Sequence, residues 1–173
     1  AALVLLGGPA LAADGGASVS HVEPTPDGLR ILVSLPEGAK VDLDAVTVKI
    51  AGKDAVATAT PAGDEGAIRR TTILAMDTSN SMKGARFEAA QAAARTFLDT
   101  VPEDVYVGIT TFADEVTQAL PPTLDRDRAR TVLDGLQLTR RTSLYNGVIT
   151  AAKQAGTQGQ RTLLVLSDGK DTS

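Results

Sequence analysis

Three continuous apolar runs in the second half of the chain constrain its fold more than any other feature of the sequence. They occupy residues 73–76, 105–109 and 163–166. Such runs are typical of strands that are buried on both faces. Between them, apolar residues recur with the period of amphipathic helices, near 85–99, 126–136 and 143–155. Strands that alternate with helices predict an open, doubly wound, mostly parallel α/β sheet of Rossmann-like type.

Two antiparallel features accompany this sheet. A β-like run over 115–120 follows Phe112 after a two-residue turn, which predicts a hairpin that adds an antiparallel edge strand. Residues 18–60 carry short runs of Val, Ile and Thr with a period of two, bounded by Gly, Pro and Asp, and these predict a small antiparallel β module. We therefore expect a β-rich module over 14–60, a linker over 61–70 and an α/β domain over 71–173.

The two ends of the sequence suggest an exported chain that continues further. Residues 1–13 form a short apolar run that ends in small residues, as at the end of a secretory signal peptide. The alternative is a buried strand or helix of the mature protein. The other end follows an apolar strand directly, where a parallel sheet normally has a covering helix. We expect a remnant of a signal peptide, an extracellular or cell-envelope location, and any membrane anchor outside this sequence.

Composition excludes several kinds of chemistry. The chain has no Cys, and its single His is His21, so a thiolate zinc site, an iron–sulfur cluster, a Cys nucleophile and a His-rich metal site are excluded. The net charge is −4 without a sustained basic run, which argues against nucleic acid as a partner. Oxygen is therefore the remaining donor for a metal ion.

Side chains with oxygen atoms occur at the expected ligand-binding edge of the sheet. In open α/β sheets, ligands bind at the carboxyl ends of the strands. The sequence places five oxygen-bearing residues at such points: Asp77, Ser79, Ser81, Thr142 and Asp168. Two carboxylates and three hydroxyls suit Mg²⁺ or Ca²⁺, and then Mn²⁺, better than Zn²⁺ or Cu²⁺. Neutral hydroxyls also leave a coordination position that a partner's carboxylate could fill.

The segment Asp77-Thr78-Ser79-Asn80-Ser81 after an apolar strand resembles the DxSxS motif of von Willebrand factor type A domains. Thr142 and Asp168 match the two later positions of the family's metal-ion-dependent adhesion site. The resemblance implies that Ser79, Ser81 and Thr142 bind the metal directly, whereas Asp77 and Asp168 act directly or through water. It also implies the strand order 3-2-1-4-5-6, so that this chain holds the N-terminal part of a truncated domain whose last strand is an exposed edge.

Other interpretations of the same residues fit less well. The serines could simply cap a helix or form a turn. An EF-hand loop starting at Asp77 would have Glu88 at its twelfth position, but Met82 stands where that loop needs Gly. Phosphatases similar to haloacid dehalogenases carry a second acid where this chain has Ser79. The sequence also contains no G-x-S-x-G motif, which argues against a serine hydrolase.

We expect from these features a protein-binding module for interaction or adhesion, without enzymatic activity, whose divalent cation captures an acidic residue of a partner protein. On this interpretation Asp77→Ala abolishes metal-dependent binding and leaves the fold intact. The alternative is a structural or assembly module of the cell envelope, attached to membrane segments beyond this sequence. A phosphohydrolase similar to haloacid dehalogenases is the third possibility.

Overall fold

The computed structural model describes residues 16–64, 66–140 and 143–169. The chain forms two compact units that meet in sequence between Ile68 and Arg69. The predicted signal-peptide remnant at 1–13 lies outside the described residues, as do the metal-site candidate Thr142 and the residues after Gly169. No helix in the described part of the chain is long and apolar enough to cross a bilayer.

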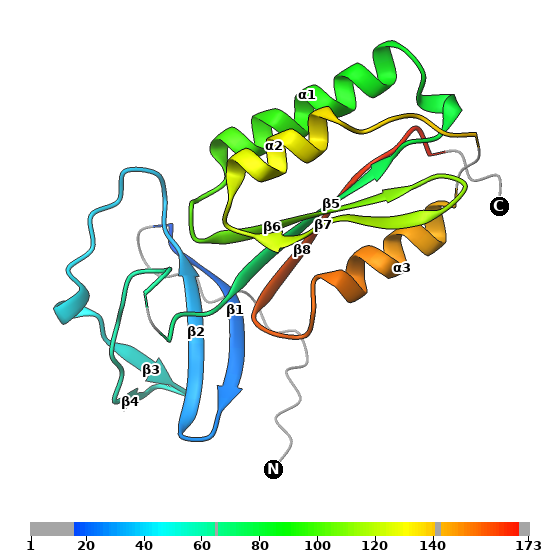
Figure 1. Cartoon of the computed structure of the whole chain (residues 1–173). Helices are drawn as coiled ribbons and strands as arrows, with labels where there is room; N and C mark the ends of the chain where they lie inside the picture. Colours follow the sequence, from blue (N-terminus) through cyan, green and yellow to red (C-terminus); the bar gives the residue numbers. More distant parts are fainter. Residues whose placement is uncertain (1–15, 65, 141–142, 170–173) are drawn as a thin grey trace. The chain divides into compact units, whose positions relative to one another are not determined.

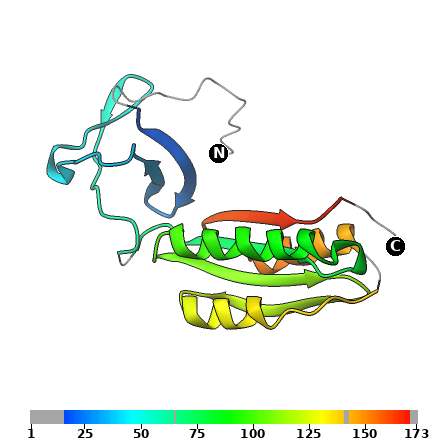
Figure 2. The same ribbon diagram turned by 90° about the horizontal axis from the view of Figure 1, so that it is seen from above.

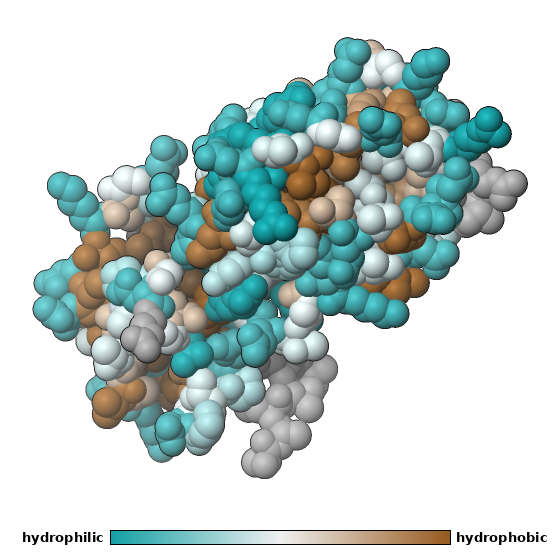
Figure 3. Space-filling view, in the orientation of Figure 1, coloured by the Kyte–Doolittle hydropathy of each residue, from teal (hydrophilic) through white to brown (hydrophobic). Residues whose placement is uncertain are grey.

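The smaller unit consists of two antiparallel hairpins. Its elements are β1 (Ser18–Thr25), β2 (Gly28–Ser34), the 3-10 helix η1 (Leu43–Ala45), β3 (Val48–Ile50) and β4 (Lys53–Ala55). β1 pairs with β2 and β3 with β4, as two separate sheets. None of the described residues before Ile68 is buried, and apolar side chains therefore lie on the surface of this unit (Figure 3). The predicted antiparallel strands are present, but they enclose little core.

The larger unit is built on one four-stranded sheet with the order β7-β6-β5-β8 (Figure 1). Its strands are β5 (Arg70–Asp77), β6 (Val105–Phe112), β7 (Val116–Thr123) and β8 (Gln160–Leu166). β5 runs parallel to both β6 and β8, while β7 pairs with β6 in the antiparallel direction. The predicted α/β fold, the 3-2-1-4 order of the first four strands and the hairpin edge strand are confirmed.

Helices cover both faces of this sheet (Figures 1 and 2). α1 (Ala85–Thr100) and α2 (Arg126–Asp134) lie on one face, and α3 (Leu144–Gln154) lies on the other. From Thr71 to Asp77 every residue of β5 is buried, because side chains that alternate between the faces meet a helical layer on each side. This double burial explains why the sequence of the central strand is a continuous apolar run.

Packing on the α3 face is close. A Cβ atom at Gly147 would lie 2.5 Å from the ring of Phe112, so a glycine lets α3 approach β6. Gly156, with φ of +76°, follows the end of α3, as expected for a helix stop.

The start of the central strand differs from the predicted linker over 61–70. Arg70 is already the first residue of β5, and its guanidinium forms a hydrogen-bonded ion pair with Asp104. The neighbouring Arg69 guanidinium lies over the Tyr106 ring, 3.7 Å from its centre. The contacts of both arginines therefore fix the position of the start of β5. The sequence Arg69-Arg70 does not distinguish a linker from the start of a strand. The residues that contact these arginines, Asp104 and Tyr106, are close to them only in the folded chain.

Candidate metal centre

The segment after β5 leaves the sheet at its carboxyl edge. The Thr78 amide still donates to the Phe112 carbonyl on β6 (3.1 Å), and the Thr78 carbonyl accepts from the Thr139 amide (2.7 Å). The chain then turns into the short 3-10 helix η2 (Asn80–Met82). Strand pairing and this turn together fix the positions of Asp77, Ser79 and Ser81.

Asp77 is fully buried and held through both carboxylate oxygens. Its Oδ1 accepts from the Ser79 amide (2.9 Å), and its Oδ2 accepts from the Ser167 hydroxyl at the end of β8 (2.7 Å). A buried carboxylate is costly unless such donors surround it. Asp77 therefore ties the loop after β5 to the loop after β8.

The hydroxyls and the second carboxylate lie next to this pair of loops. The Ser79 and Ser81 hydroxyl oxygens are 2.9 Å apart, and the Ser81 hydroxyl donates to Asp168 Oδ1 at 3.3 Å, across 87 positions of sequence. Ser79 occupies the N-cap position of η2 but makes no side-chain capping hydrogen bond. The serine hydroxyls thus meet each other and a carboxylate, which the simple capping interpretation does not explain.

Four of the five predicted site residues therefore belong to one hydrogen-bonded cluster: Asp77, Ser79, Ser81 and Asp168. We call these four residues the oxygen cluster. Thr142 precedes α3 in the sequence but lies outside the described residues. Two carboxylates and two hydroxyls converging at one edge form a donor set that fits a hard divalent cation.

The structure adds two residues to which sequence reasoning gave no role. The Ser167 hydroxyl donates a hydrogen bond to the Asp77 carboxylate and accepts one from the Gly169 amide at 3.0 Å. Arg86, the second residue of α1, donates from Nη1 to the Ser81 carbonyl at 2.8 Å, and the same atom lies 3.5 Å from Asp168 Oδ2. A hydroxyl at the end of β8 could have been noticed, since that edge was expected to bind ligands. No spacing in the sequence points to Arg86.

The EF-hand alternative does not fit the structure. Met82 is buried in the core beneath α1, and Glu88 is an exposed residue of that helix. A strand, not a helix, precedes Asp77. Among the described residues, no three His, Cys, Asp or Glu side chains gather as a metal site. A metal site built on the two carboxylates of the oxygen cluster would therefore include hydroxyl ligands as well.

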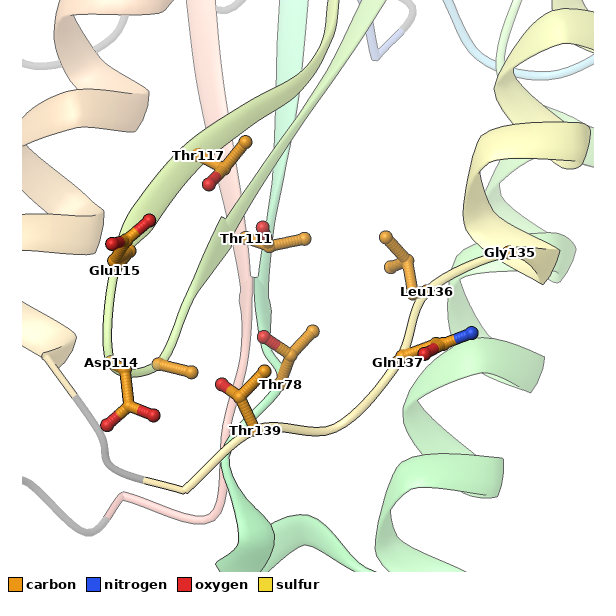
Figure 4. A pocket seen from close by; sticks show the side chains of 10 residues that line it. Thr78, Thr111, Asp114, Glu115, Thr117, Gly135, Leu136, Gln137 and Thr139 are labelled. Atoms are coloured by element: carbon orange, nitrogen blue, oxygen red, sulfur yellow. The ribbon is translucent and has the colours of Figure 1, made fainter.

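A pocket of about 470 Å³ adjoins the oxygen cluster (Figure 4). Six of its lining residues carry a hydroxyl or a carboxylate: Thr78, Thr111, Thr117, Thr139, Asp114 and Glu115. Thr78 separates Asp77 from Ser79 in the sequence, and Ser79 pairs with Thr139 as an isolated β-bridge. The oxygen cluster itself does not line the pocket. The two features are neighbours at the carboxyl edge of the sheet.

Sequences similar to this chain include proteins of bacteria. A "UPF0353 protein" of Nocardia farcinica is 30% identical over 119 residues, which cover 60% of this chain and 36% of the relative. A protein with the same description from Mycolicibacterium gilvum is 31% identical over the same shares. The chain thus spans about a third of the length of these relatives.

Solved structures share the fold. The three N-terminal domains of the type V pili tip protein Mfa5 from Porphyromonas gingivalis align with a TM-score of 0.56 and 21% identity, over 61% of this chain and 20% of that one. An aerotolerance-related membrane protein from Bacteroides fragilis aligns with a TM-score of 0.55 and 24% identity, over 60% of this chain and 56% of that one. A family model described as the von Willebrand factor type A domain matches residues 72–170. The chain therefore belongs to the von Willebrand factor type A domain family.

Proposed function

We propose that this chain is a metal-dependent protein-binding module in which the oxygen cluster and Thr142 hold Mg²⁺, or alternatively Mn²⁺ or Ca²⁺. The observation that supports it most is the contact between Ser81 and Asp168, which joins the DxSxS segment to the end of β8. The contact joins residues that are 87 positions apart in the sequence. Their convergence is what an oxygen-ligand site needs.

The residues of the oxygen cluster have distinct parts in this proposal. Ser79 and Ser81, with Thr142, present neutral hydroxyls, while Asp77 and Asp168 bring the negative charge that balances a divalent cation. Asp77 also orients the loop, because its Oδ1 accepts from the Ser79 amide. A bound ion would supply a positive centre with a free position for a carboxylate. The partner is therefore a protein that presents an Asp or Glu side chain, and the residues that flank this side chain can enter the adjoining pocket.

Metal binding is the first test, because the partner is unidentified. We expect the whole chain to bind Mg²⁺ or Mn²⁺ in isothermal titration, and Asp168→Asn to bind much more weakly. Asp134→Asn is the matched control, since Asp134 is an exposed carboxylate of the same unit that pairs with Arg95. Equal metal affinity of wild type and Asp168→Asn contradicts the proposed site.

Carboxylate capture is tested separately with peptides. Peptides containing Asp or Glu are arrayed beside twins that carry Asn or Gln, and are probed with the chain in Mg²⁺ and in EDTA. The proposal predicts binding to the acidic members only, and only with metal. Binding that persists in EDTA rules out the metal-dependent mechanism.

Export and a location in the cell envelope belong to the same proposal. The apolar run at 1–13 supports export, and the neighbours of known structure include a pilus tip protein and a membrane protein. A module that assembles envelope structures, with the site used within one chain, is the alternative. Fractionation of the full-length protein, and its release by high salt or only by detergent, separates a peripheral from a membrane-anchored protein.

We propose no enzymatic role. In a phosphohydrolase similar to haloacid dehalogenases, a second acid would stand at position 79, where a buried Ser79 meets Ser81. A hydroxyl cannot replace a carboxylate as general acid and base near neutral pH. Hydrolysis of p-nitrophenyl phosphate with Mg²⁺, lost in Asp77→Asn, would overturn this assignment.

A further inference from the structure

Arg86 places a cation against the oxygen cluster. Its guanidinium reaches from the first turn of α1, and Nη1 lies 2.8 Å from the Ser81 carbonyl and 3.5 Å from Asp168 Oδ2. The Arg86 side chain is 59% exposed, whereas that of Asp168 is only 8% exposed. The positive charge of Arg86 therefore lies on the solvent side of the nearly buried Asp168 carboxylate.

The position of Arg86 is not explained by helix stability. A cation in the first turn of a helix opposes the helix dipole, which favours acidic residues there. The neighbouring Glu88 follows that preference. The contacts of Arg86 are with Ser81 and Asp168 instead, and both residues belong to the oxygen cluster.

We propose that Arg86 is a built-in counter-ion that a divalent metal must displace from the oxygen cluster. This inference rests on the proposed metal-binding function. The Ser81 hydroxyl donates to Asp168 Oδ1, and the Arg86 guanidinium lies 3.5 Å from Asp168 Oδ2. A guanidinium and a metal cation attract the same carboxylate, so binding one weakens binding of the other.

The size of the effect follows from exposure. Ion pairs with an exposed member contribute up to about 1 kcal/mol, which corresponds to about fivefold in a binding constant. Removing the Arg86 charge should thus tighten metal binding about two- to fivefold. Removing a residue that simply orders the loop would weaken binding instead, so the sign of the change distinguishes the two roles.

The test is a Mg²⁺ and Mn²⁺ titration of the whole chain as wild type, Arg86→Gln, Arg86→Lys and Arg95→Gln. Arg86→Gln should bind about two- to fivefold more tightly, and Arg86→Lys should stay near wild type because it keeps the charge. Arg95 is an exposed arginine of the same helix that pairs with Asp134, so Arg95→Gln should change nothing. Thermal melts in EDTA check that every variant is folded.

The outcomes separate the two proposals. If wild type binds metal and Arg86→Gln binds equally or more weakly, the counter-ion role is wrong and the metal site stands. If wild type shows no binding but Arg86→Gln does, the counter-ion role is supported in its strongest form. If neither binds metal, both proposals fall.

Discussion

Replacement of Asp77 by alanine should destabilise the larger unit as well as abolish metal binding. The sequence alone suggested that this change leaves the fold intact. In the structure the Asp77 carboxylate accepts two hydrogen bonds, from the Ser79 amide and the Ser167 hydroxyl, and the Asp77 side chain is fully buried. Truncation therefore removes a link between the loops after β5 and β8.

The magnitude can be worked from these two contacts. Ser79 is 1% exposed, so its amide loses its acceptor without gaining water, at a cost of about 1–3 kcal/mol. Ser167 is only partly buried, and its hydroxyl can rotate toward solvent at a smaller cost. Relief of the buried charge offsets part of this sum. We expect a net loss of about 2 kcal/mol in the free energy of unfolding, or about 8 °C in melting temperature for a domain of this size.

The assay is urea unfolding followed by circular dichroism, with EDTA present so that metal does not contribute. Asp77→Asn keeps an oxygen acceptor for the Ser79 amide and should lose less than about 1 kcal/mol, although it removes the charge that a cation needs. Asp134→Ala is the control, because Asp134 is an exposed carboxylate. If Asp77→Ala unfolds within about 0.5 kcal/mol of wild type, where surface changes normally fall, the reasoning from the two hydrogen bonds is refuted.

Three further predictions concern metal, packing and acid. Mg²⁺ should raise the melting temperature of wild type because it binds only the folded state, and EDTA should reverse this rise. Ser81→Ala should show almost no rise with Mg²⁺, and a rise equal to that of wild type argues against the site. Gly147→Ala should lower stability by about 1–3 kcal/mol, because the new Cβ would lie 2.5 Å from the Phe112 ring; an unchanged denaturation midpoint contradicts this. The hydrogen bond from Arg70 holds the pKa of Asp104 below its ordinary value of 3.8, so the ionised pair stabilises the fold above that pH. This stability is lost as the pH falls through the lowered pKa of the folded state, and Asp104→Asn should flatten this part of the curve of unfolding free energy against pH.

Local patterns in the sequence determined most of the architecture. The pattern that predicted β5 is a continuous apolar run, as expected for a strand that is buried on both faces. The pattern that predicted α1 is an apolar spacing with the period of a helix, as expected for a helix that is buried on one face. Both patterns involve residues that are close together in the chain. The DxSxS segment was equally visible, because its spacing is local. The family resemblance that it carried is confirmed by the match over residues 72–170. The start of β5 at Arg70 was not visible, since its ion-pair partner Asp104 lies 34 residues away.

The tertiary structure alone decided which atoms of these side chains contact one another at the carboxyl edge. β5 and β8 pair in parallel register with Met76 beside Leu166, so the next residues, Asp77 and Ser167, become neighbours. The same register carries Asp168 to Ser81, and the start of α1 brings Arg86 to both. A sequence pattern records how each residue relates to its own strand or helix. Contacts between the ends of different elements depend on how those elements pair and pack in three dimensions, and this is why the hydrogen bonds of Asp77 and the placement of Arg86 appear only in the folded chain.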